Sequence, residues 1–184
     1  MTALTEFQTY ADAQAQFTPD RLWELFDGNR DALNIAHECV DRHAQSGRDA
    51  LIVVQSQGGE DVISYAELAA ASSRLAHYLE TRGVQRGDRV AIMLEPSRAF
   101  YTAMFGVIKR GAIAVPLFTL FGPDGIRLRV NDCKPALLIT NEEKAATISV
   151  TRALWVCFTA SGSSRVVPEV YWKTARSSAR DVVV

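Results

Sequence analysis

Short, uninterrupted apolar runs alternate with helical patterns through the middle of the chain, and this alternation restricts the fold more than any other feature. The runs lie at 90–94, 112–117 and 136–140, and the segments between them, 96–111 and 123–131, each open on a proline. Strands covered on both faces read as continuous apolar runs. Strand–helix–strand units with brief connections form right-handed crossovers in a parallel sheet. The pattern therefore predicts the α/β class, with a mostly parallel sheet flanked by helices.

The clearest helix start is Ser64, which is followed three residues later by Glu67. In such a capping box the hydroxyl accepts a hydrogen bond from a first-turn N–H, and the carboxylate accepts one from the N–H of the cap itself. Apolar residues then recur at helical spacing, and Gly83 stands where a left-handed C-terminal residue is favoured. Just upstream, β-branched runs at 50–55 and 62–65 flank a Gly-Gly pair and predict a β-hairpin.

The N-terminal part carries weaker signals. Residues 1–19 are polar and alanine-rich without an apolar stripe, which predicts a loosely packed arm. A short helical turn is expected from Asp20 to Gly28. Residues 34–44 are expected to form a helix, because their apolar residues recur at helical spacing and Gly47 follows as a stop.

Composition excludes several classes of function. The chain has 184 residues, of which 48% are hydrophobic and 22% charged, and its formal net charge is −1. This balance supplies no field that would concentrate the protein on phosphate backbones, so nucleic acid is not expected as a partner. The first ten residues contain no lysine or arginine, and no apolar run is long enough for a membrane span. We expect a cytoplasmic protein whose three cysteines (Cys39, Cys133 and Cys157) are reduced and structural or incidental.

The chain changes character near Ser149. Residues 1–150 hold 15 Lys+Arg and 19 Asp+Glu (−4), whereas residues 151–184 hold 5 and 2 (+3). Apolar runs at 154–158 and 182–184 are compatible with strands, but no period organises the tail. We therefore divide the chain into an N-terminal arm (1–19), a partial domain (20–148) and a divergent tail (149–184). The tail is either translated out of frame or joined from elsewhere, or it is a divergent native segment.

Four motifs in serial order carry a family resemblance over residues 20–148. They are Y-x-E-L, L-x-x-x-G-V-x-x-G-D-R-V, G-x-x-x-x-G-A-I-A-V-P-L and L-L-I-T. Together they resemble the N-terminal part of the AMP-dependent, adenylate-forming acyl-CoA synthetases. The amino-acid sequences of residues 34–44 and 116–132 are most similar to those of the acetyl, medium-chain and aryl acyl-CoA ligases.

The resemblance implies an α/β domain and a two-step reaction. A carboxylic acid and ATP condense to an acyl-adenylate with release of pyrophosphate, and the acyl group then passes to the thiol of coenzyme A. The full-length family would use ATP, Mg2+, CoA and a small-molecule carboxylic acid. Because charge builds up on the phosphates, Mg2+ and cationic or backbone donors must offset it.

The phosphate-binding groups of that family are not found here. Its phosphate loop is rich in Ser, Thr and Gly and ends in Gly-x-Pro-Lys, so that backbone N–H groups and a lysine surround the phosphates. The nearest string, Phe158 to Arg165, has small residues but lacks the second glycine and the Pro-Lys. The aromatic-Gly-x-Thr-Glu segment, the hinge aspartate and the C-terminal lysine domain are also missing. We therefore assign no catalytic residue, leave the cofactor-binding residues open, and expect no cofactor for this chain.

Several other residues were weighed as candidates for a site. His37, Cys39 and His43 lie close together, but structural zinc needs four ligands, so we assign no metal and favour a partly buried surface helix. His77 is interpreted as a solvated residue. Arg127 and Arg129, followed by Asn131 and Asp132, either lie beside a ligand mouth or form the charged exterior of a helix, and the second is favoured. Phe118 and Phe121, flanking Thr119, are the best candidates for lining an acyl or coenzyme pocket, although core packing is the commoner role.

These observations lead to a truncated acyl-CoA synthetase that is inactive alone. The alternative is a non-catalytic interaction or regulatory module that reuses the fold. A cut domain would leave an exposed sheet edge after Thr140, so a complementing polypeptide or self-association through that edge is the expected kind of protein contact.

Overall fold

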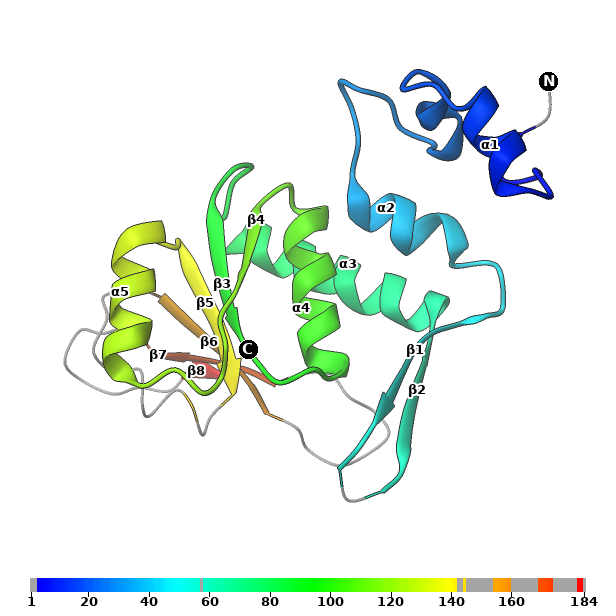
Figure 1. Cartoon of the computed structure of the whole chain (residues 1–184). Coiled ribbons are helices and arrows are strands. Elements are labelled where there is room, and N and C mark those ends of the chain that lie inside the picture. The colour runs from blue at the N-terminus through cyan, green and yellow to red at the C-terminus, as the bar shows by residue number, and fades with distance from the viewer. Residues whose placement is uncertain are drawn as a thin grey trace.

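The computed structural model describes residues 3–56, 58–141 and 144, together with strands at 154–159, 169–173 and 182–183. Helices and strands alternate between residues 65 and 141 (Figure 1). The helices are α1 (Tyr10–Gln16), η1 (Arg21–Leu25), α2 (Ile35–Cys39), η2 (Asp41–His43), α3 (Tyr65–Thr81), α4 (Arg98–Lys109) and α5 (Pro123–Cys133). The strands are β1 (Asp49–Val54), β2 (Glu60–Ser64), β3 (Arg89–Met93), β4 (Ile113–Pro116), β5 (Leu137–Asn141), β6 (Leu154–Thr159), β7 (Glu169–Lys173) and β8 (Val182–Val183).

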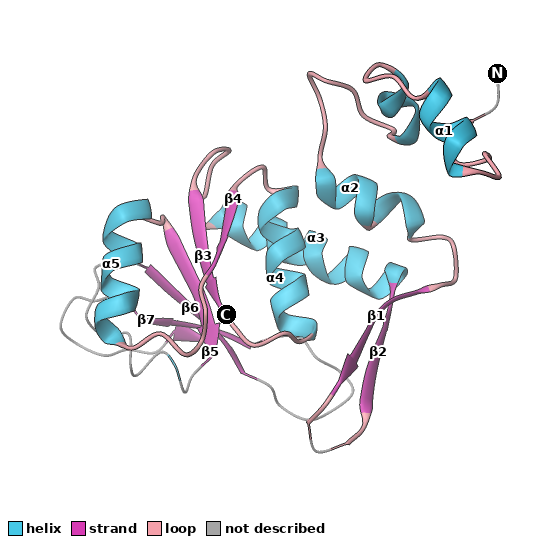
Figure 2. Ribbon diagram, viewed as in Figure 1, coloured by secondary structure: helices cyan, strands magenta, loops and turns pink. Residues whose placement is uncertain are grey.

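The strands form two sheets, as the colouring in Figure 2 shows. β1 and β2 make an antiparallel hairpin, and the other six strands follow the order β4-β3-β5-β6-β7-β8. The pairs β3–β4, β3–β5 and β5–β6 are parallel, whereas β6–β7 and β7–β8 are antiparallel. The expected α/β fold with a largely parallel sheet is confirmed.

The strands β3 and β5 are buried on both faces because helices cover each side. Figure 1 shows α3 and α4 on one side of the sheet and α5 on the other. Toward α3 and α4, Val90 and Ile92 of β3 join one apolar cluster with Leu137 and Ile139 of β5. Toward α5, the intervening strand residues join a second cluster: Ala91, Met93 and Leu138, with Ile126 and Val130 of α5. The apolar runs at 90–94 and 136–140 therefore correspond to strands with two covered faces. The run at 112–117 contains β4, an edge strand of the sheet in which Ile113 is 51% exposed.

The ends of α3 agree with their sequence signals. Ser64 Oγ accepts from the N–H of Glu67 at 3.2 Å, and the Glu67 carboxylate accepts from the N–H of Ser64 at 2.9 Å. The carboxylate also accepts from the Ser64 hydroxyl at 2.8 Å, and the two bonds that it accepts from Ser64 lower the pKa of Glu67. At the other end Gly83 has φ +77°, a left-handed conformation that lets the N–H of Val84 reach the carbonyl of Leu79 at 3.0 Å.

The hairpin is attached to the helices by one ion pair and by a small apolar cluster. Arg98, at the start of α4, donates to both carboxylate oxygens of Asp61 in β2, at 2.7 and 3.2 Å, and to the carbonyl of Val62. The hydrogen bond with Asp61 raises the pKa of Arg98. The cluster, formed by Val40, Ile63 and Leu68, joins α2, the hairpin and α3.

Two expectations about the fold need correction, and the loosely packed arm gains a helix. The single helix expected at 34–44 is broken into α2 and η2, because Val40 leaves helical geometry (φ −129°, ψ −61°) to bury its side chain in that cluster. The arm contains α1, which has a Thr9 cap and no buried residue. The open edge expected beside 136–140 is wrong, because β6 pairs with β5 there.

The crossing of α3 and α4 generates a stability prediction at Gly106. A Cβ at this position of α4 would lie 2.8–3.0 Å from three side-chain atoms of Leu75 in α3, including its Cβ. Gly106→Ala is expected to destabilise the fold by about 1–2 kcal/mol, because the clash exceeds the roughly 1 kcal/mol gain in helix propensity. Urea unfolding measures this change.

Gly125 in α5 is the matched control. A Cβ there would meet its nearest neighbours at 3.6 Å, an ordinary contact. Gly125→Ala should therefore be neutral or stabilising by up to about 1 kcal/mol. Equal effects of the two substitutions would contradict the close approach of α4 to α3.

Candidate functional site

The carboxyl ends of the parallel strands form the edge at which α/β sheets bind ligands. At this edge Thr140, the fourth residue of β5, donates its hydroxyl to the carbonyl of Met93 at the end of β3, at 3.0 Å. One loop further along, the Thr119 hydroxyl donates to the Glu95 carboxylate. The first bond joins the ends of β5 and β3, and the second joins the loop after β4 to the loop after β3. Sequence reasoning did not single out Glu95, although its place directly after a buried strand is a usable signal.

The loop after β4 alternates between buried and exposed side chains. Leu117 and Phe121 pack against the cluster between β3 and α5, whereas Phe118 is 60% exposed and Leu120 is 76% exposed. The rings of Phe118 and Phe121 meet edge to face with centroids 5.7 Å apart. Of the two phenylalanines considered for a pocket, Phe121 is a core residue and Phe118 is available to a ligand.

The basic residues of α5 are engaged locally. Arg127 pairs with Asp124 at 2.6 Å. Arg129 donates to the carbonyl of Gly125 at 2.9 Å, and its guanidinium lies 3.7 Å from the centroid of the Phe121 ring. Asn131 and Asp132, on the next turn, are exposed. This arrangement is the charged exterior of a helix, with one arginine stacked on an aromatic ring.

The histidines and Cys39 lie apart from the strand ends, on the helical layer. His37 Nε2 is 3.0 Å from a carboxylate oxygen of Asp27, and the ring of His43 packs on Tyr65 with centroids 5.2 Å apart. His77 is exposed on α3. Within the described part of the chain, no group of three or more His, Cys, Asp or Glu side chains is placed to hold a metal ion.

His37 and His77 line an open depression of about 350 Å3 between α2, α3 and α4. Lys109 also lines it; its side chain is 9% exposed, and its ammonium donates to Asp41 at 2.5 Å, to the Ala69 carbonyl at 2.9 Å and to Ser73 at 3.0 Å. Because these three acceptors already surround the cation, the depression is a packed junction of helices rather than a binding site for an anion.

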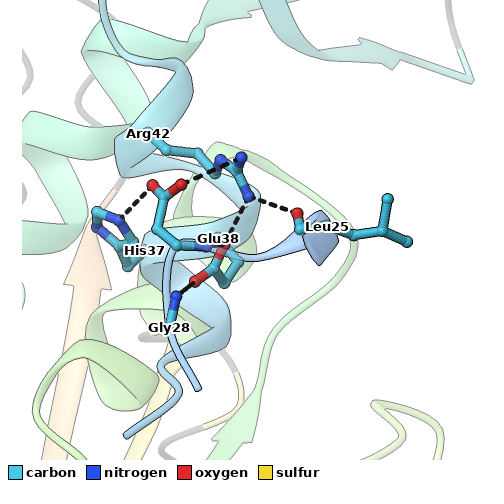
Figure 3. A network of polar contacts seen from close by, with 6 residues as sticks. Leu25, Gly28, His37, Glu38 and Arg42 are labelled. Atoms are coloured by element: carbon cyan, nitrogen blue, oxygen red, sulfur yellow. Dashed lines mark hydrogen bonds and ion pairs between the residues drawn. The ribbon is translucent and has the colours of Figure 1, made fainter. Parts of the chain in front are cut away.

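A buried carboxylate ties the N-terminal segment to the rest of the chain. Glu38 of α2 accepts from the backbone N–H groups of Asp27 and Gly28, at 3.1 and 2.8 Å, and from Arg42 at 2.7 Å. Arg42 also donates to the carbonyl of Leu25 at 2.9 Å. Figure 3 shows Glu38 between Gly28 and Arg42, with Arg42 also reaching the carbonyl of Leu25. The i, i+4 spacing of Glu38 and Arg42 was a signal for their ion pair, but nothing in the sequence indicated the backbone donors.

The remaining sequence candidates are placed as follows. Cys39 is exposed, and burial raises the pKa of the Cys133 thiol, which keeps that thiol protonated at neutral pH. The side chain of Cys157 and residues 160–165 of the string considered for phosphate binding lie outside the described residues, and Phe158 and Thr159 end β6. Among the described helices, none is long and apolar enough to cross a membrane.

Comparison with known proteins decides the family. A sequence model of the family described as AMP-binding enzyme matches residues 40–175, which is most of the chain. The chain belongs to the AMP-binding enzyme family. The resemblance drawn from the four sequence motifs is thereby confirmed.

Relatives of known name are acetyl-coenzyme A synthetases. This chain is 37% identical to the acetyl-coenzyme A synthetase of Bradyrhizobium diazoefficiens over 118 residues, which are 60% of this chain and 18% of the relative. It is 37% identical to acetyl-coenzyme A synthetase 2 of Pseudomonas putida over 123 residues, 64% of this chain and 18% of the relative. The chain thus spans about a fifth of the length of these relatives.

Solved structures agree with this placement. An acyl-CoA synthetase of Brucella canis superposes with a TM-score of 0.78 and 28% identity, over 88% of this chain and 30% of that one. MatB from Rhodopseudomonas palustris, without ligand, superposes with a TM-score of 0.57 and 26% identity, over 71% of this chain and 26% of that one.

The Glu38 network generates a prediction about pH. Burial alone would raise the pKa of Glu38, but hydrogen bonds from Asp27, Gly28 and Arg42 outweigh it and lower the pKa below its ordinary value of 4.5. Ionised Glu38 therefore stabilises the fold above pH 4.5, and this contribution is lost as the pH falls through the lowered value. Glu38→Gln should lower the melting temperature clearly at pH 7. The difference in melting temperature between this variant and the unmodified chain should narrow toward pH 3.

Thermal unfolding at pH 7, 5, 4 and 3 measures that gap. Glu60→Gln serves as the control, because Glu60 is exposed and the substitution removes a charge without breaking a described ion pair. A gap for Glu38→Gln that stays constant from pH 7 to pH 3 would show that the carboxylate is not held ionised by its partners.

Proposed function

We propose that this chain supplies the first part of the acid-activating domain of an AMP-forming acyl-CoA synthetase. The reaction of the complete enzyme converts a carboxylic acid, ATP and coenzyme A to acyl-CoA, AMP and pyrophosphate through an acyl-adenylate. The observation that carries the proposal is the agreement of a continuous family match with an intact sheet whose strands β3, β4 and β5 end at one edge. In our proposal, enzymes of this family bind small-molecule acids at that edge of the sheet, and this chain forms part of that edge.

We assign apolar contacts with the acyl chain or the coenzyme to the exposed side chains of the loop after β4. Phe118 and Leu120 stand at the sheet edge with their apolar surfaces open to solvent. Contact with the acyl chain or with the coenzyme would remove that surface from water, which contributes about 25 cal/mol per Å2. The polar bond between Thr119 and Glu95 fixes the loop in which both side chains stand.

The residues present do not fit a site for ATP and Mg2+. The string Phe158 to Arg165 lacks the second glycine and the Pro-Lys that would wrap and neutralise phosphates. No described trio of carboxylate, histidine or thiol groups is placed for a cation. We therefore propose that the chain alone does not form an acyl-adenylate, and we derive no step through the nucleotide.

Two further assignments remain proposals. We retain the division into an arm (1–19), a partial domain (20–148) and a tail (149–184), with the cytoplasm as the location. The family match reaches residue 175, and β6 and β7 join the sheet, which supports a divergent native tail over an out-of-frame one. The genomic reading frames around the codon for Ser149 discriminate between the two origins.

Isotope exchange tests the proposed lack of activity. The purified chain, ATP, Mg2+ and labelled pyrophosphate are mixed with acetate, octanoate or benzoate, and exchange of label into ATP is measured. We expect no acid-dependent exchange, because the phosphates of the transition state are not neutralised. The Bradyrhizobium diazoefficiens acetyl-coenzyme A synthetase is the positive control, and acid-dependent exchange by the chain alone would refute the proposal.

A hybrid enzyme tests the proposed contribution to the acid and coenzyme site. The matched segment of that synthetase is replaced by the corresponding segment of this chain, and a folded hybrid is expected to catalyse exchange. Phe118→Asp in the hybrid should raise the KM for the acid or for coenzyme A about tenfold, the equivalent of roughly 1.4 kcal/mol. Leu128→Asp, at an apolar residue of α5 that is 69% exposed, should leave both KM values unchanged. Equal effects of the two substitutions on the KM values would contradict the assignment of the loop after β4 to the site.

A further inference from the structure

The loop after β4 exposes apolar side chains and buries a polar one. Phe118 is 60% exposed and Leu120 is 76% exposed, whereas Thr119 between them is 7% exposed. A rotation of this segment that buried Phe118 and Leu120 would turn Thr119 outward. Burial of apolar surface is favourable, and a hydroxyl is well solvated in water. The hydrophobic effect therefore favours the rotated loop, so a specific interaction must oppose the rotation.

The other contacts of the loop fix its two ends. The N–H of Leu117 donates to the carbonyl of Ile92 in β3 at 2.7 Å, and the N–H of Phe121 donates to the carbonyl of Phe118 at 3.1 Å. Leu117 and Phe121 also pack in the apolar cluster between the sheet and α5. These contacts hold the residues on either side of the turn, but they do not engage the side chain of Thr119.

The Glu95 carboxylate supplies the interaction that keeps Thr119 inward. The Thr119 hydroxyl donates to Oε1 of Glu95. A hydrogen bond to a carboxylate is stronger than one between neutral groups, and a buried hydroxyl that lost its acceptor would be costly. Rotation of the loop would break this bond. The bond therefore opposes the burial of Phe118 and Leu120.

Ser97 fixes the backbone from which Glu95 reaches the loop. Its hydroxyl donates to the carbonyl of Glu95 at 2.9 Å and accepts from the N–H of Phe100 at 3.3 Å. Ser97 is the N-cap of α4, and Leu94, directly before Glu95, is buried in the cluster that this helix joins. Glu95 thus lies between a core residue and a helix cap, so its side chain extends from a defined position.

We propose that Glu95 is a positioning residue that acts through Thr119 and keeps Phe118 and Leu120 turned toward the ligand. This inference rests on the proposed function, which gives those two side chains contact with the acyl chain or the coenzyme. Glu95 touches no reacting atom in this role. Without its carboxylate, the loop rotates and buries the two apolar side chains, and the ligand loses their contact.

Fluorine NMR on the full chain tests the position of the loop. The chain is labelled with fluorinated phenylalanine, and a soluble gadolinium chelate speeds the relaxation of exposed rings. The Phe118 signal is assigned by its absence from Phe118→Leu. Glu95→Ala should reduce the effect of the chelate on this signal about twofold, because the ring leaves the solvent. Glu95→Gln should retain the effect, because its amide oxygen accepts the same hydroxyl.

A rescue variant tests whether Glu95 acts through Thr119. Thr119→Val has nearly the same shape but carries no hydroxyl, so burial of its methyl groups keeps it inward without an acceptor. The double variant Glu95→Ala, Thr119→Val should therefore regain the exposure of Phe118. Glu60→Ala is the matched control, because Glu60 is also exposed and makes no ion pair within the described residues. An unchanged Phe118 signal in Glu95→Ala, or a loss that Thr119→Val does not restore, would overturn the proposal.

Kinetics of the hybrid enzyme measure the consequence for binding. Glu95→Ala in the hybrid should raise the KM for the acid or for coenzyme A about tenfold. The kcat should stay within about twofold, because the loop contributes to binding and not to the chemical step. Thr119→Val should restore the KM of Glu95→Ala. A raised KM that Thr119→Val does not restore would indicate that Glu95 contacts the ligand itself, and it would refute the positioning role.

The two proposals can fail separately. Fluorine NMR requires no catalysis and uses the chain alone. A folded hybrid without exchange activity would count against the proposed function, and the exposure of the Phe118 ring would still decide whether Glu95 holds the loop. An active hybrid together with unchanged ring exposure in Glu95→Ala would refute the positioning role alone.

Discussion

Burial of β3 and β5 on both faces is the constraint on which the rest of the structure depends. Each strand sends alternate side chains toward α3 and α4 on one side and toward α5 on the other. Two apolar layers must therefore be filled at once, and the helices that fill them fix the positions of the connecting loops. Those loops include the one after β4, so the placement of Phe118 and Leu120 follows from the packing of the core residues beside it.

The sheet and its main helices were predictable because their signals are local and strong. A continuous apolar run, a Ser64–Glu67 capping box and a glycine at the C-terminal position of α3 each specify one conformation without reference to the rest of the chain. The strands β3, β4 and β5 and the helices α3 and α5 accordingly lie within a few residues of their expected bounds. The hairpin was equally clear from its two β-branched runs and the Gly-Gly pair between them.

Features set by contacts between distant residues were not predictable. The break between α2 and η2 arises because Val40 packs in a cluster with Ile63 and Leu68. Nothing in residues 34–44 themselves indicates this packing. Phe118 is exposed and Phe121 is partly buried for the same kind of reason, because only Phe121 packs against the cluster that includes α5. The donors around Glu38 come from backbone ten residues earlier, where side-chain identity gives no guidance. Tertiary packing decided the outcome in each case.

The bidentate pair between Arg98 and Asp61 links regions that are otherwise remote. Arg98 opens α4, and Glu95, three residues before it, holds the loop after β4 through Thr119. A short path of a salt bridge, the non-helical residues from Glu95 to the start of α4, and a carboxylate–hydroxyl bond thus joins the ribbon of β1 and β2 to the sheet edge. Mechanical strain applied at the tip of that ribbon has a direct route to the loops that bear Phe118, and it crosses no more than two side-chain contacts on the way.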